Sequence, residues 1–367
     1  MIELLTKGKQ EMARLTRLCM VVVFCICLSS AQPPAVAKAP DQDAGLLIPV
    51  QVDDPFSGPW GYVDLTGKFI IPARFRYADG FFENLAAVKL GSKYGFIDNT
   101  GQLVISPRFD AADDFYEDVA EVWVDGKHGF IDKTGKFVIE PQFDVAWGFH
   151  EQLAAVAVGK KFGYIDKTGK FVIPLQFTFA RNFHEGLAAV NTGDLLGYID
   201  HTGKYVIAPQ FKYAGAFHDG LALVGGAEGY GYIDRGGRIV IPPSFPLAFD
   251  FSEGRAAVVT AGKDTNYGYL DTKGTFAVAP RFAQGGEFSE GLAPVQVQQG
   301  NGYLWGYIDT SGKLVIPPQF DYGCPFSGHL AGVKVGGKMG FIDRTGKIII
   351  PPQFESIWGC GIKPLGS

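Results

Sequence analysis

The sequence predicts an all-β protein, built as a tandem array of about nine three-stranded antiparallel meanders. Three observations support this class. A glycine-centred motif recurs along most of the chain, 22 prolines are scattered through it, and its apolar stretches are short and rich in β-branched and aromatic residues. Prolines at this density argue against long helices, and apolar stretches of this kind favour strands.

The composition excludes several classes of protein. The chain has 367 residues, of which 49 are glycine and 30 are phenylalanine, with 47% hydrophobic and 19% charged residues. A disordered protein is more polar than this. The net charge of −5 argues against a nucleic-acid partner bound through its phosphates, and five cysteines are too few for a disulfide-dense scaffold.

The first 31 residues have the layout of a secretory signal peptide. Four basic residues precede an apolar run from Leu18 to Leu28, and Ser29, Ser30 and Ala31 follow it. We expect cleavage after Ala31 and a mature protein that is periplasmic or secreted. The run is shorter than the roughly 20 residues that span a bilayer, so an uncleaved membrane anchor is the alternative. No later segment is a candidate span, and residues 32–45 read as a flexible leader.

One unit repeats nine times after the leader. It starts at Trp60-Gly61-Tyr62-Val63-Asp64, and its glycine recurs every 34 residues, except for steps of 37 and 38 that end at Gly268 and Gly306. Aspartate always stands three positions after the glycine. Paired helices also repeat with this period, but the proline and glycines of each unit exclude them.

Each unit predicts two hairpins. In Asp132-Lys133-Thr134-Gly135-Lys136 the aspartate suits the start of a turn and the glycine supplies a positive φ, so this segment joins two strands. A second hairpin runs through Gly159-Lys160-Lys161. A connection of roughly ten residues then leads to the next unit. We expect its recurring phenylalanine to pack between neighbouring units: Phe75, Phe109, Phe143, Phe177, Phe211, Phe245, Phe282, Phe320 and Phe354.

These motifs resemble those of the bacterial WG repeat family. Trp60-Gly61 and Trp305-Gly306 carry the resemblance, together with the Gly-Lys, Ile-Pro-Pro and Phe-Ser-Glu-Gly-Leu-Ala elements that follow. It covers residues 46–359 and leaves residues 360–367 as a tail. The resemblance implies a β-rich repeat protein that mediates interactions, and it carries over no catalytic residue and no cofactor.

The unit by itself fits either a closed ring or an open array. Nine units exceed the usual four to eight blades of a β-propeller. The sequence also predicts that the first unit has its own opening strand in Leu47–Val52, which leaves no terminal strand to complete a split blade. We therefore expect an open, curved solenoid, with the β-propeller as the alternative.

The sequence shows no catalytic motif. Each recurring aspartate is explained by its turn. One regular carboxylate per unit is too few to bind a row of calcium ions, because each ion needs about six to eight oxygen ligands. His150, His184 and His218 occupy one position in three consecutive units, and imidazoles bind zinc or copper. Elsewhere that position holds Phe82, Tyr116, Ser252, Ser289 and Ser327, and this tolerance favours a half-exposed loop position over a metal site.

Two longer hairpins are the candidate binding surface, because repeat proteins often place insertions on their binding face. Neutral drift of tolerant loops is the alternative. The candidate residues are Asp264, Thr265, Asn266 and Tyr267 in the first, and Gln298, Gln299, Asn301, Tyr303 and Trp305 in the second.

Cys324 and Cys360 lie at nearly equivalent places in the last two units. We expect a disulfide between them, which would stabilise the terminal unit by roughly 3 to 4 kcal/mol.

The function that these features favour is a non-catalytic, exported scaffold that binds an unknown protein or envelope material. A carbohydrate-binding module, with a cell-envelope glycan as its partner, is the second hypothesis. A hydrolase whose carboxylates gather only in the folded state is the third.

Overall fold

The computed structural model describes residues 46–262 and 266–357. The expected signal peptide, leader and C-terminal tail, together with Cys360, lie outside the described residues. Within these ranges the secondary structure consists of 36 β-strands. None of the described segments forms a helix that is long and apolar enough to cross a membrane.

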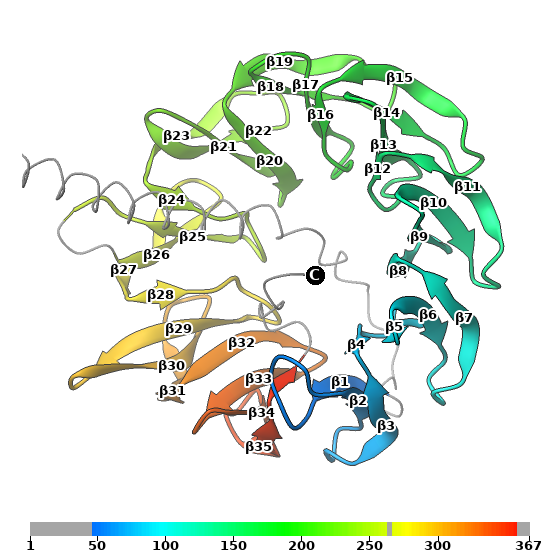
Figure 1. Ribbon diagram of the computed structural model, residues 1–367. Helices are drawn as coiled ribbons and strands as arrows, with labels where there is room; N and C mark the ends of the chain where they lie inside the picture. The colour runs from blue at the N-terminus through cyan, green and yellow to red at the C-terminus, as the bar shows by residue number, and fades with distance from the viewer. Residues whose placement is uncertain (1–45, 263–265, 358–367) are drawn as a thin grey trace, which may run out of the picture. The chain divides into compact units, whose positions relative to one another are not determined.

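The strands form nine antiparallel sheets of four strands, which are the blades of a closed β-propeller (Figure 1). Blade 1 consists of β36 (Ser356–Ile357), β1 (Ile48–Gln51), β2 (Trp60–Val63) and β3 (Phe69–Phe75). Blade 2 consists of β4 (Tyr77–Ala78), β5 (Ala86–Leu90), β6 (Lys93–Ile97) and β7 (Leu103–Phe109). Blade 3 consists of β8 (Ala111–Tyr116), β9 (Val119–Val124), β10 (Lys127–Asp132) and β11 (Phe137–Phe143).

The middle of the ring repeats this plan. Blade 4 consists of β12 (Val145–Ala146), β13 (Ala154–Val158), β14 (Lys161–Ile165) and β15 (Phe171–Phe177). Blade 5 consists of β16 (Phe179–Ala180), β17 (Ala188–Asn191), β18 (Leu196–Ile199) and β19 (Tyr205–Phe211). Blade 6 consists of β20 (Tyr213–His218), β21 (Leu221–Gly226), β22 (Gly229–Asp234) and β23 (Ile239–Phe245).

The last three blades lead back to the first. Blade 7 consists of β24 (Leu247–Ala248), β25 (Arg255–Val259), β26 (Tyr267–Asp271) and β27 (Phe276–Phe282). Blade 8 consists of β28 (Gln284–Gly285), β29 (Leu292–Gln299), β30 (Gly302–Asp309) and β31 (Leu314–Phe320). Blade 9 consists of β32 (Tyr322–Ser327), β33 (Leu330–Val335), β34 (Lys338–Asp343) and β35 (Ile348–Phe354).

Each blade has one strand more than the expected three. The additional strand comes from the connection after the recurring phenylalanine and is the inner, first strand of the blade, as Figure 1 shows for β8, β12 and β20 toward the inside of the ring. In blade 4, β12 pairs with β13 through Val145 and Ala157 and through Ala146 and Val156. The strands β8, β20 and β32 are longer, but a register shift interrupts each of them after two pairs. The prediction missed these strands because two consecutive paired residues are too few to show an alternating apolar pattern.

The expected open solenoid is wrong, because the two ends of the described chain pair within blade 1. Val50 pairs with Ile357 and Gln51 with Ser356, and the Glu355 N–H donates to the Gln51 carbonyl at 2.9 Å. The segment expected to open the first unit is the second strand of its blade. The C-terminal β36 supplies the inner strand, so the sequence repeat and the blade are out of phase by one strand.

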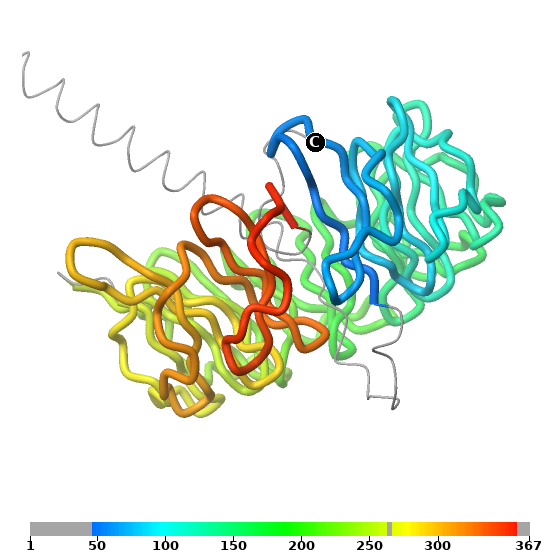
Figure 2. The backbone as a smooth tube through the Cα atoms, turned by 90° about the horizontal axis from the view of Figure 1, so that it is seen from below, coloured from blue at the N-terminus to red at the C-terminus, as the bar shows by residue number. Residues whose placement is uncertain are grey.

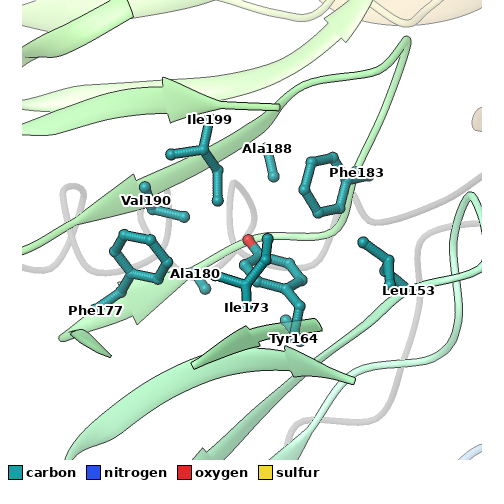
Figure 3. Packing of buried hydrophobic residues seen from close by; sticks show 10 residues of the cluster. Leu153, Tyr164, Ile173, Phe177, Ala180, Phe183, Ala188, Val190 and Ile199 are labelled. Carbon is teal, nitrogen blue, oxygen red and sulfur yellow. The ribbon is translucent and has the colours of Figure 1, made fainter. Parts of the chain in front are cut away.

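The hydrophobic core is divided into nine clusters, each between two neighbouring blades. Figure 3 shows the cluster in which Tyr164 and Phe177 of blade 4 pack against Phe183, Val190 and other residues of blade 5. The cluster between blades 9 and 1 joins Phe354 to Val50 and closes the ring. The nine recurring phenylalanines each belong to one of these clusters, which confirms their expected place between units.

The recurring aspartates have the predicted turn role. The Asp166 carboxylate accepts hydrogen bonds from the Thr168 N–H at 2.9 Å, the Thr168 hydroxyl at 2.6 Å and the Lys170 N–H at 3.1 Å. Gly169 follows with a φ of 82°. These bonds lower the pKa of Asp166, with the Thr168 hydroxyl as the largest cause.

Candidate functional site

The two kinds of hairpin lie on opposite faces of the ring, because neighbouring strands of an antiparallel blade run in opposite directions. One face carries the hairpins between first and second strands and the turns between third and fourth strands; we call it the latch face. The other carries the hairpins between second and third strands; we call it the extension face. Lys133 of one latch-face turn reaches Glu83 of a neighbouring hairpin at 3.0 Å, as this arrangement requires.

Carboxylates on the latch face join each blade to the next. Glu185 occupies a hairpin with a φ of 50°, and its carboxylate accepts a hydrogen bond from the Gly220 N–H of the following blade at 3.0 Å. The same bond recurs around the described ring, made by Glu83, Glu117, Glu151, Glu185, Asp219, Glu253 and Glu290. The sequence showed only that these acids recur in phase, and the structure assigns them a structural contact.

Buried tyrosines form a second contact between blades. The Tyr198 hydroxyl donates to the Gly215 carbonyl of the next inner strand at 2.8 Å. Six blades share this bond, through Tyr62, Tyr164, Tyr198, Tyr232, Tyr269 and Tyr307. Burial raises the pKa of Tyr198, so its hydroxyl keeps its proton. The tyrosine after the motif glycine was visible in the sequence, but its acceptor lies in another unit and was not.

The three aligned histidines belong to a row of side chains along the latch-face hairpins. The His150 and His184 rings have centroids 5.2 Å apart, and the His184 and His218 rings 5.4 Å. Tyr116 extends this row at 4.8 Å from His150. Two serines at the same position contact the next blade differently, since the Ser252 hydroxyl donates to the Phe288 carbonyl at 2.7 Å and Ser289 does likewise. The three histidines are all half-buried.

The row differs from the other described histidines in its polar contacts. His128, His201 and His329 each bond a carboxylate, those of Glu121, Glu151 and Glu290. Among the described residues, no side-chain hydrogen bond or ion pair holds the three rings of the row. The nitrogens of these rings are not fully buried, so solvent reaches them. The row therefore has free imidazole nitrogens next to water.

Burial keeps part of the row neutral. It lowers the pKa of His184 to about 4, and His150, His218 and Arg181 act in the same direction. Burial also lowers the pKa of His150, against the opposite effect of Glu117, Asp113 and Glu151. A neutral imidazole keeps a lone pair on one nitrogen. Within the described part of the chain, however, no three His, Cys, Asp or Glu side chains are already grouped to hold a metal.

Acidic groups lie at both ends of the row. Besides the three acids near His150, Asp250 interacts electrostatically with His218 and Arg181. One oxygen of Asp250 is buried without a hydrogen-bond partner, and burial raises the pKa of this carboxyl. Arg181 is the cation at this place, and its guanidinium lies over the rings of Phe179 and Tyr213.

The second longer hairpin extends two strands on the extension face. Gln298 pairs with Tyr303 and Gln299 with Gly302, which adds two rungs beyond the Val297–Leu304 pair (Figure 2). Tyr303 is 52% exposed, and Gln298, Gln299 and Asn301 are exposed with it. Trp305 is a correction: it is only 6% exposed and packs 5.2 Å from Tyr322, so it belongs to the core between blades 8 and 9.

The first longer hairpin is described only in part, because Asp264 and Thr265 lie outside the described residues. Asn266 accepts a backbone hydrogen bond from Thr260 at 3.3 Å. Tyr267 is half-buried, and its ring stacks on that of Phe249 with 6.1 Å between the two centroids.

Cys324 of β32 is buried and disulfide-bonded. Cys360 lies outside the described residues, so the pairing of these two cysteines stays a prediction.

The fold and the repeated contacts between blades define this protein as a β-propeller that is built from sequence repeats. A family model described as "WG containing repeat" matches residues 60–94, 94–127, 129–162, 162–195, 197–225, 230–263, 267–301, 305–338 and 339–359. The chain therefore belongs to the WG repeat family. No curated protein matches it.

Solved structures resemble the chain in fold. A eukaryotic initiation factor matches with a TM-score of 0.61 and 11% identity, over 85% of this chain and 96% of that one. The dihydro-heme d1 dehydrogenase NirN matches with a TM-score of 0.44 and 12% identity, over 90% and 78%. Hsv2p of Kluyveromyces lactis matches with a TM-score of 0.39 and 8% identity, over 62% and 94%. At these identities, the first likeness concerns the fold alone and the other two carry no argument.

Proposed function

We propose that the protein is a non-catalytic, exported scaffold that binds a protein partner through the hairpin of β29 and β30. The observation that carries this proposal is the two-rung extension, which exposes Tyr303 beside amide side chains. Tyrosine and amides suit protein recognition because they combine apolar contact with hydrogen bonding. The recurring acids and tyrosines also support it, since their contacts between blades explain them without a reaction.

A deletion of the two extra rungs tests this proposal. Removing Gln298, Gln299, Gly302 and Tyr303 leaves Gly300-Asn301 to join Val297 to Leu304. Two residues leave each strand, so every remaining side chain keeps its face of the sheet. We expect the immobilised full chain to capture from envelope extract a partner that the deletion variant loses.

The ordinary hairpin of blade 4 provides the matched control. Lys160 is exposed there, and Lys160→Ala should leave capture unchanged. Thermal unfolding of both variants shows whether the propeller stays folded. A partner that binds the deletion variant as tightly as the parent chain would overturn the assignment to this hairpin.

A carbohydrate-binding module is the second candidate, because exposed aromatic rings on this face also suit sugars. Trp123 of β9 is 42% exposed and stacks on His128 at 5.4 Å. A glycan array distinguishes the two functions, since sugar binding should depend on Trp123 and resist the hairpin deletion.

A further inference from the structure

We propose that His184, together with His150 or His218, forms a binding site for one divalent transition-metal ion such as Zn²⁺ on the latch face of the ring. The site is distinct from the hairpin of β29 and β30, which lies on the extension face. It depends on three features of the row: the spacing of the rings, ring nitrogens that no described residue binds, and the acidic side chains nearby.

The spacing of the rings suits two ligands of one ion. A Zn–N bond is about 2.0 to 2.1 Å, so the ion lies about 3.2 Å from the centre of each ring that binds it. Two ring centres 5.2 or 5.4 Å apart then correspond to an N–Zn–N angle of about 110°, close to tetrahedral.

Two neighbouring rings hold the ion, either those of His150 and His184 or those of His184 and His218. His184 therefore belongs to both pairs. Only neighbouring rings of the row are in contact in the described structure. Water completes the coordination, because solvent reaches these nitrogens. Such a site keeps exchangeable positions, as catalytic zinc sites do and closed structural sites do not.

Two features of the surroundings favour a cation here. The rings lack the carboxylate partners that His128, His201 and His329 have, so no protein bond must break before a metal binds. Glu117, Asp113 and Glu151 lie near His150, and the cations beside the row are Arg181 and Lys167, of which Lys167 pairs with Glu117 at 3.2 Å.

The other blades offer matched substitutions for the test. His184→Phe removes the shared ligand and introduces the residue found at the equivalent position 82. His150→Tyr and His218→Ser copy Tyr116 and Ser252 in the same way. His201→Lys is the control, because Lys133 and Lys167 occupy its equivalent positions and its ring already bonds Glu151 at 2.8 Å.

The experiment is a calorimetric titration of the untagged full chain with Zn²⁺ at pH 7. The cysteines before residue 31 are common to all variants, so only differences between variants count. We expect one site that His184→Phe weakens at least tenfold. His150→Tyr and His218→Ser should each retain it, whereas the double variant should lose it, and His201→Lys should bind like the parent chain.

The thermal midpoint gives a second readout. Zn²⁺ should raise it for the parent chain and for His201→Lys, because a ligand that binds only the folded state stabilises that state. It should not raise it for the double variant, which keeps the test decisive if His184→Phe does not fold. Equal binding by the parent chain and the double variant would overturn the proposal.

Discussion

Single residues in this propeller act mainly through contacts between blades. The motif aspartate stabilises its own turn, whereas the tyrosine two positions earlier bonds the inner strand of the next blade. The role of the aspartate could be predicted from the sequence, because its partners lie within four residues. It could not identify the acceptor of the tyrosine, which lies in a strand that the prediction missed.

The tyrosine contact predicts a measurable loss of stability. Tyr198→Phe leaves the buried Gly215 carbonyl without its donor, so the free energy of unfolding should fall by about 1 to 2 kcal/mol. Tyr303→Phe is the control, because the Tyr303 ring is exposed and should change stability by less than about 0.5 kcal/mol. Equal effects of the two substitutions in urea unfolding would argue against the contact.

The histidine row predicts a pH dependence. Folding lowers the pKa of His184 from 6.5 to about 4, so between these values the unfolded chain binds a proton that the folded chain does not. Stability should therefore fall as pH decreases from 6.5 to 4, by at most about 3 kcal/mol from this group. His150, His218 and Arg181 oppose its protonation.

Urea unfolding between pH 7 and pH 4 checks this dependence against His184→Phe. The variant should lose less stability over this range than the parent chain. Identical pH profiles would contradict the lowered pKa. The turn aspartates do not distinguish the two proteins, because their pKa values are lowered in both and their contribution is lost only at more acidic pH.

At the scale of elements, the fourth strand of each blade bends around the motif glycine. In blade 4, Phe162 pairs with Phe177 and Tyr164 pairs with Ile173. An advance of two residues along β14 therefore corresponds to four residues along β15, which is a β-bulge in β15. A Cβ atom on Gly163 would lie 2.6 Å from the Ile173 carbonyl oxygen. Close approach of two backbones therefore explains why this position is glycine in every unit.

This packing makes Gly163→Ala strongly destabilising. The β15 backbone has to shift, and we expect a loss of about 3 kcal/mol or more in the free energy of unfolding. Gly193→Ala is the matched control, since no atom lies within 4 Å of its added Cβ. Differential scanning calorimetry should show a large fall in the thermal midpoint for the first variant only.

At the scale of the whole molecule, closure of the ring depends on blade 1. Its inner strand comes from the C-terminal part of the described chain and its other three strands from the N-terminal part. Ile357 is 3% exposed and packs in the cluster between blades 9 and 1. An open array would leave this cluster and the edge of β1 in water.

Ile357→Asp should open this closure. A buried charge without a partner costs several kcal/mol, so the thermal midpoint should fall and amide exchange should increase first in β1 and β36. Ile348→Asp, on the exposed side of β35, should have little effect. Unchanged exchange in β1 after Ile357→Asp would show that the paired ends do not hold the ring.

The repeat, its turns, three strands of each blade and the phenylalanines between units could be predicted from the sequence, because these features depend on local periodicity and on turn residues. The folded arrangement was needed to find the inner strand of each blade, the closure of the ring and the contacts of the acids and tyrosines with the next blade. It was also needed to find the burial of Trp305 and the alignment of His150, His184 and His218. These features depend on how each blade is rotated against the next, and on strand pairing between the two ends of the chain, which no local pattern encodes.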